Sequence, residues 1–137
     1  NVGGGPASGI SYPLGVHYAV PHGFAGGVLL PHVVAFNVER GYHDGYARIF
    51  DRLSRHASVA PSDGANARGK AAAFRDALWD LYRTIGAPAT LARWGVDRGA
   101  VARLTDLTMA ERKANLDVNP VPCDQHAVTA LLRAVTE

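Results

Sequence analysis

The sequence predicts an all-α fold of five or six helices in a single helical domain that spans residues 1–137. Three observations predict it. Apolar residues recur at helical spacing in several segments. No strand-like alternation of useful length occurs, and no hairpin turn joins two such runs. The length suits one domain, and a hydrophobic content of 47% is ample for one core.

The first segment, residues 1–23, contains six glycines and three prolines. Glycine is entropically costly inside a helix, and proline lacks the amide donor that a helix needs. We therefore expect a loop here, with at most a short helical turn near residues 9–14. Residues 24–36 are almost all apolar, and their length and Ala and Leu content favour a buried helix. Pro31 should kink or restart this helix.

Two amphipathic segments follow. Residues 44–57 predict a helix, residues 60–69 have the composition of a loop, and residues 70–85 predict a second helix. Gly86 is placed as its left-handed C-cap, and Pro88 as a stop. The two apolar stripes comprise Tyr46, Ile49, Phe50 and Leu53, and Phe74, Leu78, Leu81, Tyr82 and Ile85.

The rest of the chain predicts one short turn and two helices. Residues 90–94 should form a turn closed by Gly95. Asp97 can cap a helix that runs to about Met109, and Asp124 can cap the last helix. Residues 115–122 read as a loop.

Composition excludes several classes of function. The net charge is only +2, and no long basic tract is present, so we expect no nucleic-acid partner. No apolar run reaches the roughly 18 to 20 residues that span a bilayer, so we expect no membrane partner. Cys123 is the only cysteine, which excludes an internal disulfide and a cysteine-based zinc cage. With no secretory leader visible, a cytoplasmic protein is expected.

The most informative segment runs from Ser8 to Asn37, SGISYPLGVHYAVPHGFAGGVLLPHVVAFN. It joins a turn rich in Gly, Pro and His to an apolar helix with a second Pro-His pair. Residues 15–23 resemble the PLG…PHG loop of the iron-containing (group III) alcohol dehydrogenases, and residues 30–37 resemble their LPHVMxFN helix. Weaker resemblances to the same family occur at residues 85–96 and 119–120. The chain thus resembles the later part of that family's C-terminal helical domain.

The resemblance implies a divided metal site. In that family an N-terminal α/β domain binds NAD(P), and the helical domain holds a metal through one Asp and three His. The Asp and the first His would come from a segment before Asn1. The last ligand corresponds to His22, and another, fourteen residues earlier, corresponds to Ser8. A further active-site His corresponds to Tyr12. We therefore take His22 as the candidate metal ligand, and Tyr12 and His17 as candidate catalytic residues.

The replacement at Ser8 bears on the cofactors. Divalent iron or zinc needs three or four anionic or imidazole ligands, and a neutral Ser hydroxyl is a poor substitute. We expect the metal site to be weakened by Ser8, and His22 alone cannot hold such a metal. A weakened site, no site, or a subgroup with altered chemistry all remain open. NAD(P) would bind only if a nucleotide-binding domain is supplied, because no Gly-rich strand-turn-helix is present.

The remaining candidates are weaker. His32 reads as a satisfied core or interface histidine, and His43, His56 and His126 as helix-end or exposed residues. Cys123 has no His at a recognisable spacing, so a nucleophilic role is not expected.

We predict that the chain is the helical metal- and substrate-site portion of an NAD(P)-dependent alcohol/aldehyde oxidoreductase, incomplete on its own. The expected partner is a second chain or an N-terminal nucleotide-binding domain. Self-association through the apolar helix at residues 24–36 is also expected. The alternative is a non-catalytic helical interaction or scaffold module derived from that family. A small DNA-binding protein is disfavoured, because the net charge of +2 is too weak for binding DNA and no recognition-helix pattern stands out.

Overall fold

The computed structural model describes residues 4–56 and 65–136. These residues form seven α-helices and two short 3-10 helices, and none of them lies in a strand, so the predicted all-α class is confirmed. Contacts between Cα atoms group the chain into two compact units: residues 1–33 with 88–137, and residues 34–87. The prediction of a single domain stays a prediction. Among the described residues, no helix is long and apolar enough to cross a membrane.

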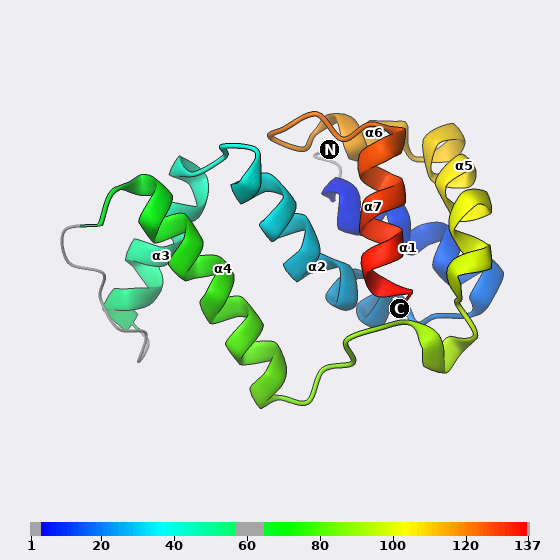
Figure 1. Cartoon of the computed structure of the whole chain (residues 1–137), viewed down its shortest axis with the longest axis horizontal. Helices are drawn as coiled ribbons and strands as arrows, with labels where there is room; N and C mark the ends of the chain where they lie inside the picture. The colour runs from blue at the N-terminus through cyan, green and yellow to red at the C-terminus, as the bar shows by residue number, and fades with distance from the viewer. Residues whose placement is uncertain (1–3, 57–64, 137) are drawn as a thin grey trace. The chain divides into compact units, whose positions relative to one another are not determined.

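The first unit contains most of the helices (Figure 1). In it, α1 packs against α5, α6 and α7, and α5 also packs against α7. Its helices are α1 (Gly5–Tyr18), the first part of α2 (His22–Glu39), η1 (Ala92–Trp94), η2 (Arg98–Ala100), α5 (Val101–Glu111), α6 (Lys113–Asp117) and α7 (Gln125–Val135).

The helix α1 corrects the prediction that residues 1–23 form a loop. Ile10 and Leu14 are 0% exposed, and full burial of such side chains contributes about 1.5–3 kcal/mol each. That gain offsets the roughly 3 kcal/mol that a proline inside a helix costs, here Pro13. Pro6 lies in the first turn, where no amide donor is needed. Burial against three neighbouring helices therefore outweighs the local composition.

The helix α2 is continuous from His22 to Glu39 with Pro31 inside it, so the helix does not restart at Pro31, and the alternative, a kink there, stays a prediction. Leu29 and Ala25 are fully buried, as expected for a buried helix. The boundary between the two units falls within this helix.

The second unit consists of the end of α2 with α3 (Asp44–His56) and α4 (Ala67–Thr84). Lys70 of α4 pairs with Asp51 of α3 across 2.8 Å. The predicted stripes supply part of the core, but Ile49 and Leu53 of the first stripe are exposed. Leu81 and Ile85 of the second stripe are exposed as well. A small core cluster comprises Val34, Val38 and Ala71, with Tyr46, Phe74 and Leu78 packed against it.

The structure also tests the predicted helix ends. Asp97 and Asp124 each accept a hydrogen bond from the backbone amide three residues later, so both predicted N-caps are confirmed. Gly86 and Gly95 adopt positive φ angles, as their predicted positions require. The predicted loop at 115–122 is wrong in its first part, because residues 113–117 form α6. Residues 60–64 of the other predicted loop lie outside the described residues, and residues 67–69 belong to α4.

Candidate functional site

The turn between α1 and α2 positions the predicted metal ligand. Ala19 adopts a left-handed conformation with φ of 52°, and its amide donates to the Leu14 carbonyl, which ends α1. A non-glycine residue in this region is strained by about 1–2 kcal/mol, and such strain persists only where the surroundings impose it. Buried Val20 follows, and α2 begins at His22. The sharp turn brings His22 back alongside α1.

Ser11 holds the ring of His22. The Ser11 hydroxyl donates to the Ser8 carbonyl oxygen at 2.9 Å, and Ser11 Oγ lies 3.2 Å from His22 Nδ1. A Ser hydroxyl has a single hydrogen, so when that hydrogen goes to Ser8, His22 must donate through Nδ1. The Nε2 lone pair of His22 is then left as an acceptor or ligand, and the His22 side chain lies at the surface.

Tyr12 lies on the same face of α1 as Ser8, four residues earlier, whereas the adjacent Ser11 points about 100° away around the helix and is buried. Its side chain is 46% exposed. The guanidinium carbon of Arg112, from the junction of α5 and α6, lies 3.2 Å from the centre of the Tyr12 ring. Tyr12 and His22 are thus both exposed side chains of the surface at the α1–α2 turn.

His17 lies elsewhere. At 3.6 residues per turn it is about 140° around α1 from Tyr12. Its Nδ1 lies 3.3 Å from Arg103 Nη2 of α5. The structure therefore joins Ser8, Ser11 and His22 through hydrogen bonds and places Tyr12 next to Ser11 along α1. Within the described ranges it shows no contact that joins His17 to them.

The metal predicted from the resemblance requires more ligands than this surface offers. No group of three or more His, Cys, Asp or Glu side chains that could hold a metal ion occurs among residues 4–56 and 65–136. His22 offers one suitable donor atom, and Ser8 supplies no imidazole or carboxylate. These residues therefore do not make a metal site by themselves.

The other histidines and the cysteine lie outside this surface. Burial disfavours the charged form of His32 and lowers its pKa. His43 Nε2 lies 3.1 Å from the Val38 carbonyl oxygen, and His126 is exposed. The side chain of His56 lies outside what the structure describes. Cys123 is buried.

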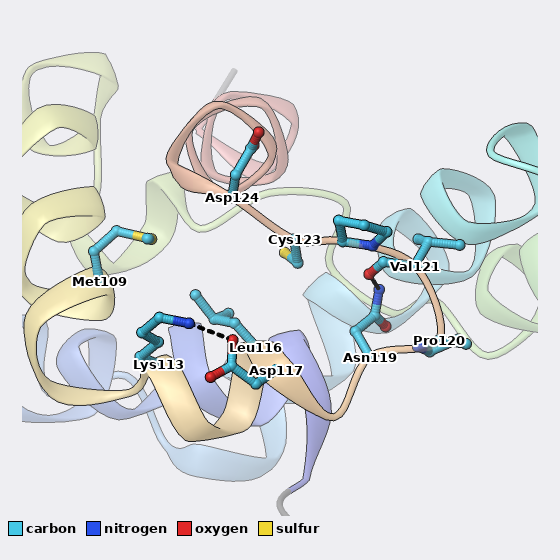
Figure 2. A pocket seen from close by; sticks show the side chains of 10 residues that line it. Met109, Lys113, Leu116, Asp117, Asn119, Pro120, Val121, Cys123 and Asp124 are labelled. Atoms are coloured by element: carbon cyan, nitrogen blue, oxygen red, sulfur yellow. Dashed lines mark hydrogen bonds and ion pairs between the residues drawn. The ribbon is translucent and has the colours of Figure 1, made fainter.

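A cavity of about 540 Å³ lies between α5, α6 and the loop that leads to α7 (Figure 2). Met109, Leu116 and Val121 give it apolar walls. Its charged side chains already have partners: Lys113 pairs with Asp117, and Asp124 caps α7. Sequence reasoning placed no site here.

Sequence reasoning missed two residues of the surface around His22, namely Ser11 and Arg112. Ser11 carried a local signal, since it lies three residues after Ser8 on one helical face. Arg112 carried none, because it reaches Tyr12 only through the packing of α6 on α1.

Comparison with known proteins gives an independent view. Residues 1–136 match the family model described as "Fe-containing alcohol dehydrogenase family, C-terminal". The chain is 30% identical over 109 residues to lactaldehyde reductase of Escherichia coli K12, a match that covers 80% of this chain and 27% of that protein. It is 29% identical over 123 residues to maleylacetate reductase 1 of Cupriavidus pinatubonensis, covering 90% of this chain and 29% of that protein.

The fold has solved counterparts. A crystal structure of 1,3-propanediol oxidoreductase superposes with a TM-score of 0.80 at 25% identity, covering 94% of this chain and 32% of that one. An archaeal halo-thermophilic alcohol dehydrogenase from a Red Sea brine pool gives a TM-score of 0.78 at 22% identity, over 93% of this chain and 31% of that one. The chain therefore spans less than a third of the length of each of these relatives.

Proposed function

We propose that this chain, which belongs to the Fe-containing alcohol dehydrogenase family, is one portion of a larger enzyme. That portion would be the helical metal- and substrate-site part of an NAD(P)-dependent alcohol/aldehyde oxidoreductase. The family is one of iron-containing alcohol and aldehyde oxidoreductases. Since the chain spans less than a third of its relatives, the nucleotide-binding part and the other metal ligands would come from a further domain or a partner chain.

One observation carries this proposal: His22 stands at the surface of the α1–α2 turn with Nδ1 engaged by Ser11. A histidine whose second ring nitrogen is tied down in this way presents Nε2 in a fixed direction. In such an enzyme a divalent metal would act as a Lewis acid on the substrate oxygen while the nicotinamide exchanges hydride. The role of His22 is to supply one donor atom at that site.

The neighbouring residues would shape the substrate side of the site. Tyr12 occupies the position of an active-site His in the resembling family, and its exposed phenol ring offers an apolar face and a hydroxyl. Ser8 offers a hydroxyl where the family has an imidazole ligand. The catalytic role predicted for His17 stays a prediction, and its contact with Arg103 favours a role in joining α1 to α5.

The proposal is tested on the protein as isolated, with any companion domain or chain that accompanies it. Zinc and iron content is measured by mass spectrometry, and NAD(P)H oxidation is followed with a panel of aldehydes. His22→Ala should lose at least 100-fold in activity and most of the bound metal, because a ligand is removed. His126→Ala changes an exposed histidine of α7 and should leave both unchanged.

Retention of full activity and metal by His22→Ala would overturn the assignment of His22. If the unmutated protein binds no metal and oxidises no NAD(P)H with any aldehyde, the proposal itself fails and the non-catalytic scaffold becomes the better account.

A further inference from the structure

We propose that Arg112, stacked on Tyr12, forms an anion subsite next to His22 that binds a carboxylate group of the substrate. The substrate would then be a small aldehyde or ketone that also bears a carboxylate, or the corresponding hydroxy acid. This inference rests on the proposed function, and it names the substrate class for the same site.

The backbone of Arg112 is firmly placed. It lies at the junction between α5 and α6, where its amide donates to the Thr108 carbonyl at 2.9 Å. The amide of Asn115 in turn donates to the Arg112 carbonyl at 2.9 Å, which closes the first turn of α6. The Cβ of Arg112 lies 3.6 Å from where a Cβ on Gly9 would stand, so this residue packs directly against α1. The guanidinium of Arg112 therefore lies at a fixed position against α1, over the Tyr12 ring.

The guanidinium of Arg112 lies against a ring, and no ion pair joins it to a carboxylate of residues 4–56 or 65–136. It lies over the Tyr12 ring at 3.2 Å, and its Nε is buried with no hydrogen-bond partner among the described residues. Four other cationic side chains among the described residues do have acidic partners: Lys70 with Asp51, Arg75 with Asp76, Arg83 with Asp80, and Lys113 with Asp117. Arg112 has no acidic partner among the described residues, and because its Nε is buried, an incoming anion would bind at the terminal nitrogens.

The chemistry of the group selects the ligand. A guanidinium presents its N–H donors in a planar fork that matches the two oxygens of a carboxylate. Stacking on Tyr12 fixes the plane of the fork and reduces the side-chain entropy lost on binding. The side chain is partly exposed, so an anion can reach its terminal nitrogens from solvent. Desolvation by the Tyr12 ring strengthens the attraction to an anion relative to a fully exposed arginine.

The position of the subsite relates it to the reacting centre. Tyr12 directly follows Ser11, whose hydroxyl holds His22, and both residues are helical neighbours of Ser8, at spacings of three and four residues. A short molecule could therefore place its carboxylate at Arg112 and its carbonyl oxygen toward His22. This arrangement would orient the substrate by two polar ends, which an uncharged aldehyde cannot reproduce.

The test compares two matched aldehydes on the protein as isolated: succinic semialdehyde, which carries a carboxylate, and butanal, which has the same carbon chain length and no charge. Arg112→Gln should raise KM for succinic semialdehyde by about 10- to 100-fold, the range expected for loss of a charge-assisted bidentate contact. KM for butanal and for NAD(P)H should change less than twofold. Arg112→Lys keeps the charge without the fork and should fall between.

The control variant is Arg40→Gln. Arg40 also stacks on a ring, with its guanidinium carbon 3.8 Å from the centre of Phe36, but it follows the opposite end of α2 from His22. Arg40→Gln should leave KM unchanged for succinic semialdehyde, for butanal and for NAD(P)H. Circular dichroism of each variant establishes that the helices persist.

The outcomes are distinct. An equal rise in KM for both aldehydes in Arg112→Gln would overturn the inference. A rise in KM for NAD(P)H, with KM for succinic semialdehyde unchanged, would also overturn it, because Arg112 would then bind a phosphate of the cofactor. A calorimetric titration with succinate, without cofactor, keeps the two proposals separate. Succinate binding that is lost in Arg112→Gln supports the subsite even if no aldehyde is reduced, whereas binding that survives Arg112→Gln refutes the subsite even if the protein is an active reductase.

Discussion

Gly9 of α1 lies so close to Asn115 of α6 that a Cβ built on Gly9 would stand 3.0 Å from the Asn115 Cβ. This approach lets α6 rest directly on α1, with Leu116 also against Gly9. The same packing delivers Arg112 to Tyr12. The glycine that counted against a helix in the sequence is therefore what allows the helix to be covered.

Gly9→Ala should destabilise the protein by up to about 2.5 kcal/mol. Alanine gains about 0.5–1 kcal/mol of helix propensity, but the overpacked contact with Asn115 should cost about 1–3 kcal/mol. The matched control is Gly26→Ala in α2, where a Cβ would meet nothing within 4 Å. This substitution should stabilise the protein by about 0.5–1 kcal/mol. Urea unfolding followed by circular dichroism measures both. Equal stabilisation by the two changes would mean that α6 does not rest on Gly9.

Ser11→Ala should release the ring of His22. In the neutral ring of the unmutated protein, nitrogen NMR should show Nδ1 protonated and Nε2 unprotonated, because Ser11 gives its own hydrogen to Ser8. In Ser11→Ala the two tautomers should mix, and metal binding at His22 should weaken by about 10- to 100-fold.

Ser54→Ala is the control for the Ser11 prediction. Ser54 makes the same kind of bond, its hydroxyl donating to the carbonyl of Asp51 three residues before it. This change removes a similar hydroxyl from α3 and should leave the His22 signals unchanged. A ring that carries its proton on Nε2 in the unmutated protein would show that Ser11 donates to His22.

His32 should make stability depend on pH. Burial lowers its pKa in the folded state below the ordinary value of about 6.5, so the unfolded state binds a proton more readily. The unfolded state therefore gains protons first as the pH falls below about 6.5, and the free energy of unfolding decreases until the lowered folded pKa is reached. Above about pH 7.5 both states are neutral at this residue, and its contribution no longer varies.

Urea unfolding at a series of pH values between 5 and 8 tests the role of His32. The slope of stability against pH in this window should be smaller in His32→Gln than in the unmutated protein. His126→Gln, at an exposed position of α7, should keep the slope. An unchanged slope in His32→Gln would assign the pH dependence to another group.

The elements that the sequence predicted well are those whose signals are local. Asp97 and Asp124 stand before apolar stripes and cap helices as expected, since a cap needs only its own first turn. The helix α1 could not be predicted in the same way, because Ile10 and Leu14 stabilise it through burial against helices more than 80 residues later in the chain.

The candidate site divides along the same line. His22 and Tyr12 were found through a motif within 15 residues of sequence, which the resemblance supplied. The contact of Ser11 with His22 depends on the tight turn at Ala19, and the contact of Arg112 with Tyr12 depends on two helices far apart in the chain. The spacing of Ser11 from Ser8 is visible in the sequence, but the contact of Arg112 with Tyr12 leaves no pattern there, since it arises from packing.

Asp124→Ala should destabilise the protein by about 0.5–2 kcal/mol through its effect on α7. Asp124 Oδ1 accepts a hydrogen bond from the Ala127 amide at 2.9 Å, and without it the first turn of α7 is left with an unsatisfied donor. The turn carries Val128, which is fully buried, so fraying also exposes core surface. Asp124→Asn keeps a hydrogen-bond acceptor at the cap, so its loss of stability should be only a few tenths of the loss in Asp124→Ala. Because both variants remove the carboxylate, a large loss in Asp124→Asn as well would show that the charge at the helix start, and not the hydrogen bond, stabilises α7.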